Sequence, residues 1–229
     1  MSVMSIGRRS CALVAIAMLA ARAMSAQGVV SGTVSILERG DVRTTDLANA
    51  VVWLEAKDGA RGDPTPNAQI VMESRTFVPR VRVVRAGSTV TFPNQDPFRH
   101  NVFSKSGPSE FDLGLYARGQ DRGSRLERSG VYPIFCNIHA KMTAYVVAVP
   151  TAWVAQPGSD GSFTIAGVPA GTYTLHVWHE RGGEQTREVV VGAGDAPTVA
   201  VQLDARSYRF VQHRNKFGQE YTTTGRDRY

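Results

Sequence analysis

Three side chains that bind soft metals follow one another at three-residue spacing in the segment Cys-Asn-Ile-His-Ala-Lys-Met: Cys136, His139 and Met142. Sulfur ligands favour Cu(I) and imidazole also accepts Cu(II), so this set suits copper. Zinc prefers several thiolates or three nitrogens, and a thioether adds little for it. A trigonal copper site needs one further histidine. His100, which follows an expected strand at residues 88–93, is placed to supply it.

Each of these residues also has an ordinary structural interpretation. Cys136 could be a small buried hydrophobic residue, Met142 a core residue, and His100 a histidine in a turn or on the surface. The combination is more specific than its members, because beyond residue 26 the chain contains one cysteine and, besides Met142, only Met72 as a methionine. The sequence therefore predicts a copper site built from these side chains.

The first 26 residues have the parts of an export signal. These are Arg8 and Arg9, an apolar run at residues 11–21, and small residues that end at Ala23 or Ala26. The apolar run is too short to span a bilayer. We expect a cleaved signal peptide and a periplasmic protein, which contacts the membrane only if the leader stays uncleaved. Removal of the leader also removes the other cysteine, so the mature chain cannot form an internal disulfide.

The composition is that of an ordinary globular chain. Of 229 residues, 42% are hydrophobic and 20% are charged, which excludes a fully disordered, collagen-like or multi-span membrane protein. The formal net charge of +6 comes from the two ends of the chain, since the leader and residues 206–229 are rich in arginine. The part between them is nearly balanced, so we expect no basic face and no nucleic-acid partner.

Most of the chain after residue 27 reads as β-strands. Apolar, β-branched and aromatic residues recur in short segments bounded by turn residues, and no window shows a clear helical period. The expected strands include residues 29–37, 50–56, 81–85, 89–92, 131–136 and 144–149. The sequence therefore predicts an all-β fold of one or two sandwiches.

The run from Phe77 to Val102, which ends in His-Asn-Val, and the later Cys-x-x-His-x-x-Met loop resemble the cupredoxins. The likeness is greatest to the plastocyanin-like and amicyanin-like group and to bacterial periplasmic proteins of the methylamine-utilization type. It covers about residues 66 to 150 and implies a Greek-key β-sandwich.

The same resemblance assigns roles to individual residues. It implies that His100, Cys136 and His139 are equatorial ligands of one type 1 (blue) copper and that Met142 is the long axial ligand. It also implies that Asn101, which follows the first histidine, connects the two ligand loops through hydrogen bonds.

Residues 159–177 resemble the carboxypeptidase-regulatory-like β-sandwich, a second small β-sandwich without peptidase chemistry. The strands that normally open that fold match Gly-Thr-Val at Gly32 and Ala-Val-Val-Trp-Leu at Ala50, far upstream. We therefore expect a discontinuous sandwich, residues 28–63 and 151–204, with a cupredoxin domain at residues 64–150 inserted in it. The alternative is that residues 28–63 add strands to the cupredoxin sheet.

Residues 205–229 are basic and polar, and we expect them to form a mobile tail. The alternative is a packed terminal strand around Tyr208. Two histidines near each other in the sequence, His176 and His179, should face opposite sides of a strand and so form no second metal site.

These observations predict a periplasmic blue copper protein that carries single electrons between redox partner proteins and is not an enzyme. A multicopper enzyme would need a further histidine cluster, which His176, His179 and His213 do not provide. Two alternatives stay open: a copper-binding or copper-delivery protein of the bacterial envelope, and a non-redox envelope binding module.

Overall fold

The computed structural model describes residues 27–40, 44–57, 59, 62–194 and 197–221. The predicted leader, residues 1–26, and the last part of the predicted tail, residues 222–229, lie outside the described residues. Among the described residues, no helix is long and apolar enough to cross a membrane. A short 3-10 helix, η1 (Leu47–Asn49), precedes the second strand.

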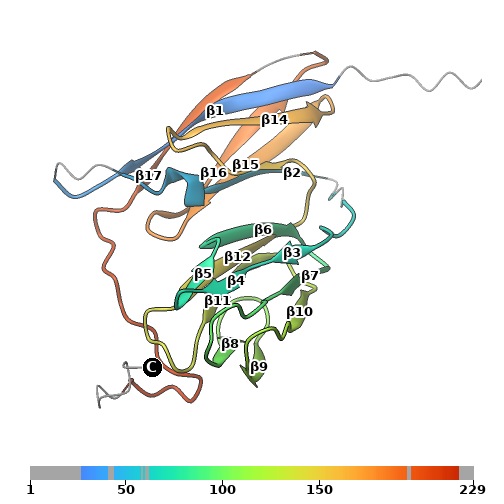
Figure 1. Ribbon diagram of the computed structural model, residues 1–229. Helices are drawn as coiled ribbons and strands as arrows, with labels where there is room; N and C mark the ends of the chain where they lie inside the picture. Colours follow the sequence, from blue (N-terminus) through green and yellow to red (C-terminus); the bar gives the residue numbers. More distant parts are fainter. Residues whose placement is uncertain (1–26, 41–43, 58, 60–61, 195–196, 222–229) are drawn as a thin grey trace, which may run out of the picture.

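The first strands of the chain pair with its last strands. One sheet has the order β14-β1-β17, and the facing sheet has the order β13-β2-β15-β16 (Figure 1). We call this part the outer sandwich. Its strands are β1 (Gly28–Leu37), β2 (Val51–Ala56), β13 (Val154–Ala155), β14 (Ser162–Val168), β15 (Gly171–His179), β16 (Gly183–Val191) and β17 (Thr198–Asp204).

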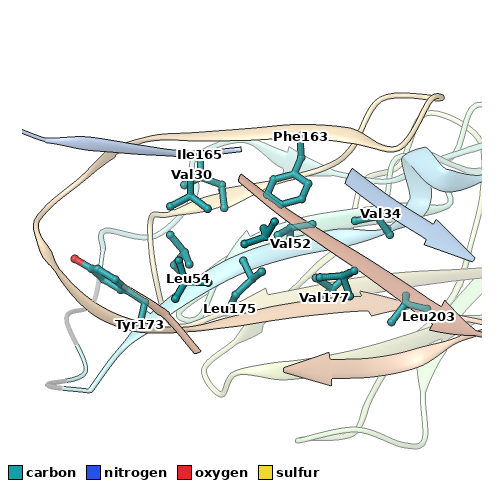
Figure 2. Packing of buried hydrophobic residues seen from close by; sticks show 14 of the residues in the cluster. Val30, Val34, Val52, Leu54, Phe163, Ile165, Tyr173, Leu175, Val177 and Leu203 are labelled. Atoms are coloured by element: carbon teal, nitrogen blue, oxygen red, sulfur yellow. The ribbon is translucent and has the colours of Figure 1, made fainter. Parts of the chain in front are cut away.

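Alternating burial along these strands builds the core of the outer sandwich. In β1 and β17, buried residues alternate with more exposed ones, so one face of each strand points between the sheets. Figure 2 shows the result: Val30 and Val34 face Val52, Leu54 and Leu175 across the layer. Gly32 is required here, because a Cβ atom at this position would collide with the carbonyl oxygen of Val199 and the ring of Phe163.

The segment between β2 and β13 forms a second sandwich, which we call the inserted sandwich. It has a sheet of order β6-β12-β11-β8-β9, a sheet of order β10-β7-β3, and the hairpin β4-β5. Its strands are β3 (Ala68–Gln69), β4 (Val71–Glu73), β5 (Thr76–Val78), β6 (Val81–Arg85), β7 (Ser88–Thr91), β8 (His100–Ser104), β9 (Phe111–Tyr116), β10 (Gly123–Leu126), β11 (Gly130–Phe135) and β12 (Thr143–Val149). Cys136 and Met142 belong to its buried core.

An apolar contact joins the two sandwiches, between the β2–β15 sheet of the outer sandwich and the β12 sheet of the inserted sandwich. Val51, Trp53 and Trp178 lie on the β2–β15 sheet of the outer sandwich, and Val147 and Val149 lie on β12 of the inserted one. All five side chains are buried. The ring of Trp178 lies 5.4 Å from that of Tyr145, measured between centroids. Hydrophobic burial therefore joins the sandwiches in addition to the chain connections.

The predicted all-β fold with two sandwiches is confirmed. β1 pairs with β14 and β17, and β2 pairs with β13 and β15, so these first strands do not extend the sheets of the inserted sandwich. This pairing is what the predicted insertion requires. The residue boundaries of the two domains stay a prediction.

The described part of the C-terminal segment, residues 205–221, contacts the inserted sandwich, and the mobility of the tail stays a prediction. After β17 the chain forms no strand around Tyr208. It crosses instead to the inserted sandwich (Figure 1), where the ring of His213 stacks on Phe135 with 4.3 Å between centroids. The basic and polar composition of this segment favours a mobile tail. It does not reveal these contacts, because they come from a few aromatic and hydrogen-bonding side chains that are far apart in the segment. Residues 222–229 of the predicted tail remain outside the description.

Removal of the indole at the contact between the sandwiches should weaken the fold. Trp178 is 7% exposed, and truncation of a buried tryptophan to alanine costs about 3 to 5 kcal/mol. We expect Trp178→Ala to lower the free energy of unfolding by that amount in a denaturant titration. Val190→Ala, on the neighbouring strand at a position 65% exposed, is the control and should stay within about 0.5 kcal/mol of the wild type. Equal unfolding midpoints for the two variants would contradict a shared core.

Candidate metal centre

The predicted ligand loop, residues 136–142, is closed by two adjacent strands. Cys136 follows the end of β11, and Met142 precedes the start of β12. Phe135 and Thr143 are antiparallel partners at the base of the loop. Inside it, the N–H of Cys136 donates to the carbonyl of Met142 at 3.3 Å, and the N–H of Met142 donates to the carbonyl of His139 at 3.0 Å. The three-residue spacing thus corresponds to a tight, internally hydrogen-bonded turn.

His100 comes from the neighbouring strand. It is the first residue of β8, which pairs with β11 through Phe103 and Phe135. This pairing brings the start of β8 next to the residue that follows β11. The side chains of His100 and Cys136 are fully buried, and that of His139 is half-buried.

Three donor atoms form a compact triangle. The Nδ1 atoms of His100 and His139 lie 3.1 Å apart, and the Sγ atom of Cys136 lies 3.7 Å from the first and 3.6 Å from the second. The centre of such a triangle is about 2.0 Å from each atom, close to metal–nitrogen and metal–sulfur bond lengths of about 2.0 to 2.3 Å. Two imidazoles and a thiolate in a plane are the donor set of a trigonal copper site. These residues therefore fit a copper ion.

The sulfur of Cys136 lies among backbone donors. The N–H groups of Ile138, Asn101 and His139 point to it. Burial raises the pKa of the Cys136 thiol, and these three hydrogen bonds act in the opposite direction. The net direction of this pKa is upward, so the thiolate that these donors stabilise also depends on a bound cation to balance its charge.

Asp96 orients the ring of His100. The Nε2 atom of His100 lies 2.7 Å from Oδ2 of Asp96, so the ring donates its proton there and presents an unprotonated Nδ1 to the triangle. Burial lowers the pKa of His100, which favours the neutral ring that a metal requires. Burial acts to raise the pKa of Asp96, but its hydrogen bonds outweigh this and the net direction is downward. The carboxylate therefore stays charged and stays an acceptor.

The turn of the β4-β5 hairpin holds Asp96 in place. The backbone N–H of Ser74 donates to its Oδ1 atom at 2.7 Å and that of Arg75 to its Oδ2 atom at 2.9 Å. Ser74 and Arg75 form the two-residue connection between β4 and β5, with φ of 54° and 57°. Asn94 closes the other side, since its Oδ1 atom accepts the N–H of Asp96.

Asp96 has no role in the site predicted from the sequence. The available signal was the spacing of Asp96 and His100, four residues apart in the motif that ends in His-Asn-Val. A carboxylate at this separation can reach a histidine ring only if the loop between them turns back. The geometry of that loop depends on Asn94, whose amide donates to the carbonyls of Phe98 and Tyr116.

Asn101 reaches the ligand loop through its backbone and not through its side chain. Its backbone N–H points to the sulfur of Cys136, while its side-chain amide donates to Oδ1 of Asp112 at 2.7 Å. The thioether of Met142 is buried in the core beside the loop. Its role as the axial ligand stays a prediction.

The remaining histidines lie apart from the triangle. His176 stacks on Trp53 and contacts Glu184 at 2.6 Å, whereas His179 is buried and accepts the N–H of Arg181 through its Nδ1 atom. The structure thus separates His176 and His179, as strand alternation predicts. Across the part of the chain that the structure describes, the group of His100, Cys136 and His139 is the one that could hold a metal ion.

Comparisons with known proteins match two parts of the chain. Residues 140–204 match the family model described as "Carboxypeptidase regulatory-like domain". A stretch of 104 residues, 44% of this chain, is 28% identical to "Amicyanin-alpha" from Methylorubrum extorquens and covers 87% of that protein. Both predicted resemblances are therefore confirmed. The family match begins within the ligand loop and leaves out β1 and β2.

Some solved structures also show a weak likeness to this chain. Amicyanin from Paracoccus versutus is 22% identical with a TM-score of 0.34, and the match covers 42% of this chain and 90% of that chain. A purple cupredoxin from Nitrosopumilus maritimus is 23% identical with a TM-score of 0.33, and the match covers 36% and 99%. A copper-containing nitrite reductase from Thermus scotoductus is 21% identical with a TM-score of 0.35, and the match covers 49% of this chain but 28% of the reductase.

Loss of the carboxylate that orients His100 should weaken metal binding. Removal of such a partner typically lowers metal affinity about 10- to 100-fold. We expect this loss of copper affinity for Asp96→Asn in a competition titration of the metal-free protein against a chelator. Asp121→Asn removes an exposed carboxylate of the same sandwich and should bind copper as the wild type does. Equal affinities for the two variants would contradict the assigned role of Asp96.

Proposed function

We propose that this chain binds one copper ion through His100, Cys136, His139 and Met142 and carries single electrons in the periplasm. The observation that carries the proposal is the triangle of two imidazole nitrogens and one buried sulfur. The 28% identity to an amicyanin over 104 residues supports the same interpretation. When bound, copper would supply the Cu(II)/Cu(I) couple.

The chain's own contribution is to hold the donors in place in both oxidation states. Asp96 fixes the ring of His100, and backbone N–H groups surround the sulfur of Cys136. His100 and Cys136 lie in a close-packed core, where side chains have little room to rearrange. Small rearrangement between oxidation states favours electron transfer over binding and release of the metal.

The route for the electron would pass through the half-buried edge of the site. His139 is more exposed than His100, and the adjacent Ile138 is 45% exposed. The ring of Phe98 lies 5.7 Å from that of His139, between centroids, and shields it on one side. We propose that redox partner proteins dock at this edge.

Catalysis at a second copper would need additional imidazoles. Among the described residues, His176, His179 and His213 lie outside the group that could hold a metal ion. We therefore propose a carrier without substrate chemistry. Delivery of copper to another protein is the alternative that the same ligands would allow.

Copper loading provides the direct test. With Cu(II) the protein should show an intense visible charge-transfer band from a short bond between copper and the thiolate of Cys136. The band should be absent in Cys136→Ser and unchanged in His176→Asn, which alters a histidine outside the site. A colourless copper-loaded wild type would contradict the electron-carrier proposal. Rapid loss of Cu(I) to a mild chelator would favour delivery instead.

Substitution of Met142 tests the axial position. The axial ligand tunes the potential of such sites, and an oxygen donor stabilises Cu(II) relative to Cu(I). Met142→Gln should therefore lower the reduction potential and Met142→Leu should raise it, with the visible band retained in both. Voltammetry measures the shifts. If both variants keep the wild-type potential, Met142 is a core residue and not a ligand.

A further inference from the structure

The segment after the outer sandwich lies against the ligand loop of the inserted one. We call residues 206–221 the C-terminal strap. In Figure 1 it leaves β17, runs past both sandwiches and ends beside the loop that joins β11 to β12. Its contacts there involve the backbone carbonyl of Cys136, the side chain of Asn137, and Asp112, which is the hydrogen-bond partner of Asn101.

The first contact is made by Tyr221. Its hydroxyl donates a hydrogen bond of 2.6 Å to the backbone carbonyl of Cys136, 85 residues earlier in the chain. This carbonyl belongs to the peptide that leads from the end of β11 into the loop. The orientation of that peptide influences the following N–H groups of Ile138 and His139, which point to the sulfur. A hydrogen bond at the carbonyl therefore acts on the surroundings of the thiolate.

The second contact is made by Lys216, which binds the ligand loop directly and the segment of His100 through Asp112. Its backbone N–H donates to Oδ1 of Asn137 at 2.9 Å. Its ammonium group lies 2.7 Å from Oδ2 of Asp112, and the other oxygen of Asp112 accepts the side-chain amide of Asn101. The strap thus connects the residue after Cys136 with the residue after His100.

The strap is ordered by contacts of its own. The ring of His213 lies flat on Phe135, with an interplanar angle of 22°, and meets the ring of Tyr221 edge-on at 5.3 Å. Asn215 organises the turn between them, since its side chain accepts the N–H groups of Phe217 and Gln219. These contacts place the hydroxyl of Tyr221 and the side chain of Lys216 beside the ligand loop at the same time.

We propose that Tyr221 is a positioning residue of the metal centre, which fixes the Cys136 peptide through its carbonyl and so sets the environment of the copper–thiolate bond. The role in the copper site rests on the proposed function. The hydrogen bond joins two protein groups, so its effect on the loop is measurable in the metal-free protein.

The test compares Tyr221→Phe with Tyr208→Phe in the full chain. The first variant removes only the hydroxyl at the loop. The second removes a hydroxyl from the same segment where it packs on the core of the outer sandwich. All proteins carry Cys11→Ser, so that Cys136 is the thiol that reacts.

The first measurement is the rate at which a thiol reagent labels Cys136 in the metal-free protein. Loss of one hydrogen bond should make opening of the loop about two- to tenfold more frequent, so Tyr221→Phe should be labelled faster by this factor. Tyr208→Phe should match the wild type. Equal labelling of Tyr221→Phe and wild type would overturn the proposal.

The second measurement is the reduction potential of the copper-loaded protein. Without the hydroxyl, the carbonyl dipole near the site is less neutralised and the donors at sulfur are less fixed, and both changes favour Cu(II). Tyr221→Phe should therefore lower the potential, and Tyr208→Phe should leave it unchanged. Faster labelling with an unchanged potential would also overturn the proposal, because the strap would then only shield the thiol.

The measurements distinguish the electron-carrier function from the positioning role of Tyr221. If the wild type shows no visible band with Cu(II), the electron-carrier function fails, and the labelling rate alone decides whether Tyr221 holds the loop. If the band is present and Tyr221→Phe behaves as the wild type in both measurements, the function stands and the positioning role fails.

Discussion

The strongest constraint on this structure is a group of two imidazole nitrogens and one sulfur within 3.7 Å of one another. Two of the three side chains, His100 and Cys136, are fully buried. Buried polar groups destabilise a fold unless each has a partner. The neighbouring structure provides those partners, since Asp96 accepts the proton of His100 and backbone N–H groups surround Cys136. The turn after β4 and the loop before β8 are shaped to make these contacts.

All three donors of the site come from the start of β8 and from the turn between β11 and β12. β8 and β11 are neighbours in one sheet, so His100 at the start of β8 meets Cys136 just after the end of β11. β12 returns antiparallel to β11, and the turn between them adds His139. Positions at strand ends are held by the sheets and vary little, which suits a site whose donors must keep fixed distances.

Much of the site could be predicted from the sequence because its signal is local. Residue type and spacing identified His100, Cys136 and His139, and the structure brings these three together. Asp96 was missed because its contact depends on a loop that folds back around Asn94. The strap was missed because Tyr221 reaches Cys136 across 85 residues, and no local pattern records such a contact. The contact between the sandwiches had a signal, since residues 50–54 are apolar without alternation, as in a strand buried on both faces.

The chain leaves the outer sandwich from β2 and returns to it as β13, and these two strands are hydrogen-bonded neighbours, with Val154 opposite Trp53. While the intervening segment is unfolded, this pairing must close a long flexible loop, at a cost in chain entropy that rises with the length of the loop. Once the inserted sandwich has folded, its own strands already hold β6 and β12 side by side, with Val81 opposite Tyr145. The entropy cost therefore favours folding of the inserted sandwich first. The outer sandwich then forms after β2 and β13 have been brought close together.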